Sequence, residues 1–425
     1  MSEEKLVPKL RFSGFDDEWN QYYLKDVIQD FINGQTPSRN VDSFWNGDVN
    51  WVSSGELNYN YITSTIEQIT AEGKNNTNLK LLSPGTFLIA ITGLEAPGTR
   101  GSCAILGIEA TTNQSCMALL PKEDKIITKF LYYWYLKVGE TYGIKYTQGT
   151  KQQSYNKELL EKLPITIPDI REQNKISEFL SVLNHKIELL EQKYQYYQEF
   201  KKYLMQQIFT QKLRFVDFNN SSWKDYKFKD LGTVKSGVGF SNKYQGHLDL
   251  DYNFYKVSDM NLKGNEKVMT RSNNTIDDNL LKDIGVKLIE NPSIIFAKVG
   301  EAIFLNRKRI AKQPFLIDNN MMAFSPNENV DLEFMYYLAT SINFGKYAQT
   351  GALPSYNASD IYSIKCKIPP IEEQKRIGKL LSLADNKIDF CSNQLNKTQE
   401  FKKGLLQQMF VVQLILSLLQ NKKHI

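Results

Sequence analysis

The sequence predicts an α+β protein in which two pseudo-repeated α/β domains are separated by two long antiparallel coiled-coil helices. Three observations predict this: an internal repeat, two long stretches with heptad spacing, and short β-rich runs between Gly/Pro turns. The 425 residues suffice for two domains of ordinary size. Hydrophobic residues make up 41% and charged residues 23%, as in folded globular proteins.

The internal repeat decides the architecture. Pro168-Asp169-Ile170-Arg171-Glu172-Gln173 matches Pro369-Pro370-Ile371-Glu372-Glu373-Gln374 at an offset of 369 − 168 = 201 residues. Other matches are Ser154-Tyr155-Asn156 with Ser355-Tyr356-Asn357, Glu199–Lys202 with Glu400–Lys403, and Leu10-Arg11-Phe12 plus Trp19 with Leu213-Arg214-Phe215 plus Trp223. The interiors, roughly 30–110 and 235–315, have diverged. One scaffold therefore presents two different surfaces, which suits a protein that reads two unlike targets; neutral drift after an old duplication explains the divergence equally well.

Residues 171–209 and 372–410 each predict one long helix, because their apolar residues recur in alternating steps of four and three. Asp169 with Glu172 forms a plausible capping box at the start of the first. At about 1.5 Å per residue, 39 residues span roughly 58 Å. The predicted seam residues are Ile176, Leu180, Leu183, Ile187 and Leu190 in the first helix and Ile377, Leu381, Ile388, Leu395 and Leu405 in the second. A coiled coil used for oligomerisation is the alternative.

The repeat and the heptads together divide the chain into four parts. These are an N-terminal domain over 1–168, a central long helix over 169–212, a second domain over 213–369 and a C-terminal long helix over 370–425. Because each helix follows its own domain, antiparallel pairing would place the two domains at opposite ends of a rod. We expect such a rod to fix the distance between the two targets.

The domain interiors alternate short strands with single helices. In the first domain a strand is predicted over Thr86–Ile91 and a helix over Ile126–Val138. In the second, a strand over Ile294–Ala297 follows Asn291-Pro292, and a helix is predicted near Asp331–Ser341. Both domains are therefore expected to be α+β.

Polar and basic loops follow these runs, and their side chains are the types that read base edges in the DNA major groove. The same residues occur in any solvent-exposed loop, so that interpretation stays open for each of them. Arg307-Lys308-Arg309 is the best candidate for phosphate contact. The candidate DNA-binding residues are Gln35, Ser38, Arg39, Asn40, Arg100, Lys145, Lys151, Gln152, Asn242, Lys243, Lys298, Arg307, Lys308 and Arg309.

Several function classes lack support in the sequence. The N-terminus has no signal peptide pattern, and the longest apolar stretch, Val411–Leu419, is too short to cross a bilayer, so we expect a cytoplasmic protein with no membrane partner. Four scattered cysteines and three scattered histidines predict neither a zinc site nor a disulfide framework. No P-loop, nucleophile elbow or metalloprotease motif is present, and Gly237-Val238-Gly239 lacks the third glycine of a dinucleotide fingerprint. The net charge of +5 permits nucleic-acid binding but argues for it only weakly.

Together these features resemble the specificity subunits of type I restriction-modification systems. The resemblance rests on Pro8–Phe12, on Gly34–Ser38, and on Ile167-Pro168 and Ile368-Pro369, each followed by Glu-Gln and a long helix. It covers essentially the whole chain. It implies two target-recognition domains that bind double-stranded DNA at a bipartite asymmetric sequence, in a subunit without catalysis or cofactor of its own.

The same resemblance implies partners: two methyltransferase subunits and, with them, restriction and translocase subunits. S-adenosylmethionine, ATP and Mg²⁺ would belong to those partners. The apolar stretch Val411–Leu419 continues the heptad phase beyond the point where the first copy turns into its next domain, which departs from the repeat. The alternative function is a coiled-coil protein-interaction scaffold with two ligand-binding domains.

Overall fold

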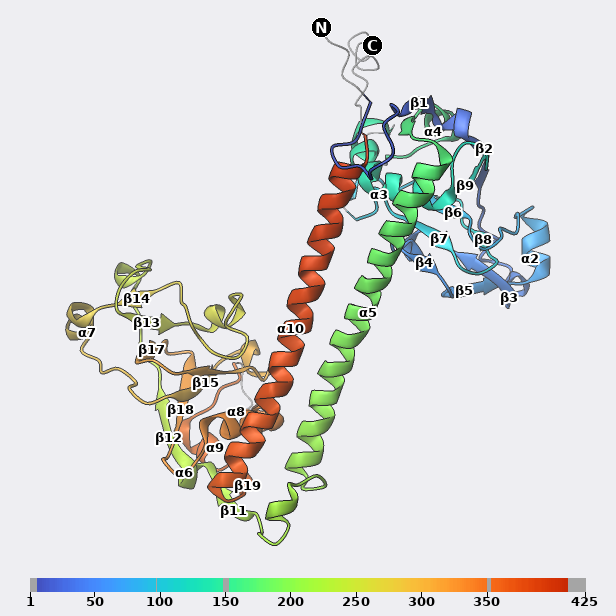
Figure 1. The fold of residues 1–425 in the computed structure, drawn as a ribbon. Helices are drawn as coiled ribbons and strands as arrows, with labels where there is room; N and C mark the ends of the chain where they lie inside the picture. The colour runs from blue at the N-terminus through green and yellow to red at the C-terminus, as the bar shows by residue number, and fades with distance from the viewer. Residues whose placement is uncertain (1–5, 97, 148–152, 350–352, 412–425) are drawn as a thin grey trace. The chain divides into compact units, whose positions relative to one another are not determined.

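The computed structural model describes residues 6–96, 98–147, 153–349 and 353–411. They divide into two compact units, Met1–Leu190 with Gln394–Ile425, and Glu191–Asn393. Two long helices, α5 (Ile170–Phe209) and α10 (Ile371–Met409), each contribute one half to each unit (Figure 1). The N-terminal half of α5 shares a unit with the C-terminal half of α10, so the helices are antiparallel and the predicted fold class is confirmed.

The bounds of both long helices agree with the heptad prediction to within one residue. Prolines stand just before each start, with Pro168 two residues before α5 and Pro369-Pro370 directly before α10, where a missing N–H costs nothing. Just beyond the end of α5, Gln211 adopts a left-handed conformation with φ 61°. The N–H groups of Lys212 and Leu213 then both donate to the carbonyl of Gln207, which closes the helix.

The residues of the predicted seam differ in burial along the helices. In the first unit Ile176, Leu180, Leu183 and Leu405 belong to the hydrophobic core, and Ile187 and Leu190 are also buried. In the second unit Ile377 and Leu381 are buried with Leu204 and Ile208, while Ile388 is only half-buried. Leu395, in the first unit, is half-buried as well. The most buried seam positions are those that also contact a domain.

The first unit contains two sheets and a closing ribbon. The larger sheet has the strand order β2-β9-β6-β7-β4, the smaller has the order β5-β3-β8, and the antiparallel ribbon pairs β1 with β10. The strands are β1 (Asn20–Tyr23), β2 (Ile28–Asn33), β3 (Trp45–Val52), β4 (Tyr61–Ile62), β5 (Glu67–Ile69), β6 (Phe87–Ala90), β7 (Cys103–Leu106), β8 (Thr111–Thr112), β9 (Cys116–Pro121) and β10 (Pro164–Ile167). The short helices are α1 (Leu24–Val27), α2 (Ala71–Asn76) and α4 (Lys157–Glu161).

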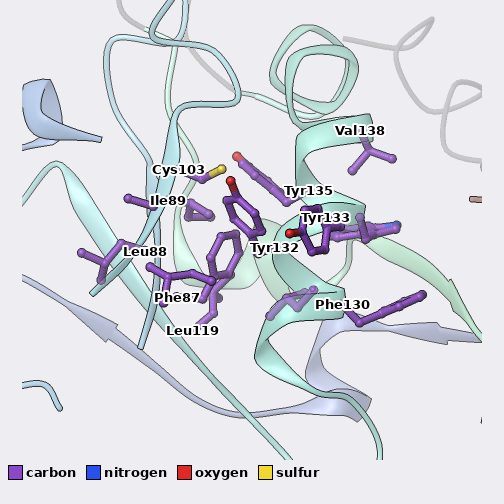
Figure 2. Packing of buried hydrophobic residues seen from close by; sticks show 14 of the residues in the cluster. Phe87, Leu88, Ile89, Cys103, Leu119, Phe130, Tyr132, Tyr133, Tyr135 and Val138 are labelled. Atoms are coloured by element: carbon purple, nitrogen blue, oxygen red, sulfur yellow. The ribbon is translucent and has the colours of Figure 1, made fainter. Parts of the chain in front are cut away.

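Helix α3 (Thr128–Lys145) supplies the aromatic side of this core. Tyr132 and Tyr135 pack edge-on against Phe87 of β6, with ring centroids 6.2 and 5.8 Å apart, and all three are buried (Figure 2). The helix runs past Val138, where the prediction ended, because its glycines serve close packing. A Cβ on Gly139 would lie 2.8 Å from the Cα of Gly101, so the glycine admits a neighbouring loop and does not end the helix.

The second unit repeats this plan with different strands. Its larger sheet has the order β12-β18-β15-β16, its smaller sheet the order β14-β13-β17, and β11 pairs with β19. The strands are β11 (Lys224–Lys227), β12 (Gly232–Ser236), β13 (Tyr252–Tyr255), β14 (Thr275–Ile276), β15 (Ser293–Ala297), β16 (Lys308–Ala311), β17 (Phe315–Ile317), β18 (Met321–Pro326) and β19 (Lys365–Ile368). The helices are α6 (Phe228–Leu231), α7 (Asp278–Ile284), α8 (Leu332–Ser341) and α9 (Ala358–Tyr362). Asp331 caps α8 through its side chain, as the predicted start implies.

A buried ion pair explains the repeated Arg and Glu. Arg11 donates from Nε and Nη2 to the two carboxylate oxygens of Glu172, each over 2.8 Å, and Trp19 Nε1 donates to the same carboxylate over 3.2 Å. In the second copy Arg214 and Trp223 bind Glu373 in the same way. The predicted capping box is therefore half right. Asp169 caps the Glu172 N–H over 2.8 Å, but the Glu172 carboxylate binds Arg11.

The glutamine that follows is a second anchor. Gln173 donates from Nε2 to the carbonyls of Pro168 and Lys125, and its Oε1 accepts from the N–H of Ile127, just before α3. Gln374 likewise donates to Pro369 and accepts from Asp331 at the start of α8. The Pro-x-x-x-Glu-Gln motif thus fixes the start of each long helix to both ends of its own domain.

Candidate nucleic-acid interface

The first polar loop of each domain leaves its sheet through a glycine that no other residue can replace. Gly34 N–H donates to Cys116 and Gln35 N–H to Thr112, and a Cβ on Gly34 would lie 2.2 Å from the carbonyl of Asn113. Gly237 follows β12 in the same way, and its Cβ would lie 1.8 Å from the carbonyl of Asp318. Gly237 therefore serves a close backbone approach.

The loop after β2 carries four candidate residues of the first domain. Gln35, Ser38, Arg39 and Asn40 are all exposed. Arg39 lies 3.6 Å above the ring of Trp45, and both of its terminal nitrogens bind Glu67. This hydrogen bonding lowers the pKa of Glu67 and keeps it charged. Arg39 must exchange Glu67 for a phosphate or base to contact DNA. The Ser38 hydroxyl accepts only the N–H of Asn40, over 3.4 Å, among the hydrogen bonds of the described residues.

The remaining candidates of this domain lie near the end of α3. Arg100 is half-buried, packs its aliphatic stem toward Gly143 and donates to the carbonyl of Glu95 over 3.3 Å. Lys145 lies 5.1 Å from the ring of Tyr146. Lys151 and Gln152 lie outside the described residues. Arg100 and Lys145 thus share one region, separate in sequence from the loop after β2.

In the second domain the candidates occupy the loops after β12 and β15. Asn242 and Lys243 are exposed, and Lys243 lies 4.3 Å from the ring of Tyr244. Lys298 is half-buried at the end of β15, and its carbonyl accepts from the N–H of Tyr356. Arg307 is exposed, and its Nη1 donates to the side chain of Asn261.

The structure corrects the prediction for Lys308. The residue begins strand β16, is 2% exposed, and donates from Nζ to the carbonyl of Ile342 over 3.0 Å and to Asn306. Burial lowers its pKa to about 7. A buried amine cannot reach a phosphate, so Lys308 is not a DNA contact. Arg309 is half-buried, and its Nη1 and Nη2 donate to the backbone carbonyls of Lys308 and Met260. Arg307 is therefore the exposed cation of the three.

Sequence reasoning assigned Glu172 only to a helix cap and missed its ion pair with Arg11. The identity of Arg, Trp and Glu in both copies was the available signal, since repeated buried contacts require repeated partners. Within the described ranges, no three His, Cys, Asp or Glu side chains are grouped so as to hold a metal ion. None of the helices described here is both long and apolar enough to cross a membrane.

Two copies of one scaffold, each presenting different polar loops, define a modular recognition protein. The chain belongs to the family of the type I restriction modification DNA specificity domain, whose model matches residues 16–196 and 220–400. The two matches contain the two sets of loops described above.

Relatives extend over the whole chain. The MjaIX specificity subunit of a type I restriction enzyme from Methanocaldococcus jannaschii is 25% identical over 415 residues, which covers 92% of each protein. The EcoR124I/EcoR124II specificity subunit from Escherichia coli is 28% identical over 204 residues, 45% of this chain and 49% of that subunit. The crystal structure of a type I S subunit from M. genitalium matches with a TM-score of 0.60 at 17% identity, covering 96% of this chain and 100% of the other. A structure from a type I restriction-modification system solved for its complex assembly matches with a TM-score of 0.57 at 13% identity, covering 95% and 100%.

Proposed function

We propose that this chain is the DNA specificity subunit of a type I restriction-modification complex and that it reads a bipartite asymmetric sequence, one half-site with each domain. The observation that carries the proposal is the contrast within the repeat. The anchors at Glu172 and Glu373 are the same in both copies, whereas the loops that follow β2 and β12 differ at most positions. Counted from Gly34 and Gly237, the candidates Gln35, Arg39 and Asn40 have different counterparts, and only Ser38 has an identical one. Equal scaffolds with unequal loops are what two different half-sites require.

The exposed side chains of these loops have the chemistry of base and phosphate recognition. Gln35, Asn40 and Asn242 can pair with adenine, and Lys243 and Arg307 can bind guanine or phosphate. The loops after β2 and β12 are held by their sheets through Gly34 and Gly237, so these two loops are positioned before DNA arrives. Fixed loops reduce the ordering cost of binding.

Partner subunits supply the catalysis in this proposal. We infer that two methyltransferase subunits bind the long helices, and that restriction and translocase subunits join them with S-adenosylmethionine, ATP and Mg²⁺ as their cofactors. Exposed apolar side chains on the helices outside the seam support this: Phe179, Val182 and Leu189 in the first unit, and Tyr196, Phe200, Tyr203, Leu383 and Phe390 in the second. Apolar side chains on a long helix suit docking of partner helices. The complex would act in the cytoplasm.

DNA binding across a range of salt concentrations tests the proposal. For the purified chain or its complex with the methyltransferase, the logarithm of the DNA affinity should fall linearly with the logarithm of the salt concentration. The slope should be about −0.9 for each phosphate contacted. Lys243→Gln should reduce that slope by about one, whereas Lys224→Gln, on a strand outside the loops, should not. A flat salt dependence, or methyl transfer by the chain without a partner, would contradict the proposal.

A further inference from the structure

The connection between β15 and β16 presents an apolar tip to solvent. Phe304 is 55% and Leu305 58% exposed, and Leu353, from the loop before Ser355, is 61% exposed. These three residues are called the apolar tip below. Large apolar side chains that are this exposed reduce solubility, and groups of them often mark binding sites.

The tip is held by a rigid framework. Asn306 adopts a left-handed conformation with φ 51°, its Oδ1 accepts from the N–H of Phe344 over 3.0 Å, and its Nδ2 donates to Ile342 over 3.2 Å. The buried Lys308 joins Asn306 to the carbonyl of Ile342, with its Nζ 4.0 Å from the ring of Phe344. The side chain that was expected to contact phosphate instead fixes the position of Phe304 and Leu305.

Two glycines bring the parts of the tip together. A Cβ on Gly345 would lie 3.3 Å from the ring of Phe304, and a Cβ on Gly300 would lie 3.7 Å from Leu353. Gly300 has φ 78°, and its N–H donates to Pro354 over 2.8 Å, which ties the two loops to each other. The exposed apolar group is therefore preorganised by both loops.

The described part of the equivalent connection between β6 and β7 in the first domain carries no such tip. Over its described residues, 91–96 and 98–102, no large hydrophobic side chain is exposed, and Leu94 is buried. The tip is thus a property of one recognition surface and not of the shared scaffold. That is the distribution expected of a specificity determinant.

We propose that the apolar tip contacts thymine methyl groups in the major groove of the half-site that the second domain reads. The inference rests on the proposed DNA-reading function. Lys298 and Arg307 border the tip on its own connection and Lys346 follows Gly345, with Glu301 as the acidic residue among them, so a polyanion is the better partner. The thymine methyl is the apolar group that base edges offer in that groove.

Deoxyuridine substitution tests the proposal, because it removes that methyl and nothing else. The motif is first identified by mapping methylated adenines, and each thymine on either strand of the second half-site is then replaced by deoxyuridine. The full chain in its methyltransferase complex should bind at least one substituted duplex about fourfold more weakly. A variant with Phe304→Ser and Leu305→Ser should bind the thymine duplex about tenfold more weakly and should no longer distinguish it from deoxyuridine.

Val216→Ser is the matched control, since Val216 is 82% exposed in the same unit away from the tip, and it should keep the discrimination. Equal affinity of the unsubstituted chain for every thymine and deoxyuridine duplex overturns the inference. So does a double variant that keeps its DNA affinity but fails to bind the methyltransferase, because the tip would then be a protein contact. Failure of the unsubstituted chain and its complex to prefer the motif at all would instead contradict the proposed function.

Discussion

Single residues determine how each domain is joined to its helix. The Glu172 side chain is 2% and the Arg11 side chain 15% exposed, so this ion pair is largely shielded from water. The Arg39–Glu67 pair, with side chains 54% and 39% exposed, has similar bidentate geometry in solvent. Because both are bidentate Arg–Glu pairs, comparing them shows how burial changes the contribution of such a pair to stability.

Glu172→Gln should lower the free energy of unfolding of the first unit by about 3 kcal/mol, because it leaves the half-buried Arg11 guanidinium without its carboxylate. Glu67→Gln should cost under about 1 kcal/mol, because water solvates Arg39. Urea unfolding of the two variants measures both values. Equal losses would show that burial does not set the strength of these pairs.

The stability of the second unit should depend on pH through Lys308. Burial lowers its pKa to about 7, below the ordinary value of 10.5, so above pH 7 the unfolded chain binds more protons than the folded one. The free energy of unfolding should therefore rise between pH 7 and 8.5, by up to about 1.4 kcal/mol per unit. Lys308→Met should abolish this rise in urea titrations, and an unchanged rise would assign it to another group.

Among the secondary-structure elements, the two copies differ in the polar contacts at the helix seam. Asp385 binds Lys201 of α5, accepts from Tyr337 of α8, and lies 3.4 Å from Lys267. The equivalent residue of the first copy is the neutral Asn184, which donates to Tyr133 over 3.0 Å. Lys201, which interrupts the heptad pattern, is thus paired with the Asp385 carboxylate, and the first copy has the neutral Asn184 in place of Asp385.

Replacing Asp385 by Asn, as the first copy has, should destabilise the second unit by on the order of 2 kcal/mol, because Lys201 loses its carboxylate in a half-buried site. A double-mutant cycle with Lys201→Met should give a coupling energy above about 1 kcal/mol. Additive effects of the two substitutions would mean that the pair does not stabilise the seam.

The sequence predicted the helices and strands better than it predicted the roles of individual side chains. The long helices were predicted to within one residue because heptad spacing records a continuous contact along each helix. The end of α3 was predicted too early, at Val138, because a glycine such as Gly139 usually disfavours a helix. Only the fold shows that Gly139 packs against Gly101. Lys308 was wrongly predicted to contact phosphate because it lies in a run of three basic residues. Strand alternation places it on the same face as Ile310, and only the fold shows that this face is buried.

The molecule as a whole contains two copies of one scaffold. Each unit has a larger sheet, a smaller sheet and a closing ribbon, and each is fixed to its long helix by the same Arg, Trp, Glu and Gln contacts. A recognition domain whose anchors lie outside its variable loops can change its target without disturbing the helices. The two domains should therefore read their half-sites independently of each other.

Exchange of residues 20–165 for the equivalent region of a relative tests this independence. The hybrid chain takes its loops from the relative but keeps Arg11, Trp19, Glu172 and Gln173 of this chain, which lie outside the exchanged residues. The exchanged chain is expressed with its methyltransferase partner, and methylated adenines are mapped across the genome. One half of the methylated motif should change and the other half should stay the same; a change in both halves, or in neither, would contradict the independence of the two domains.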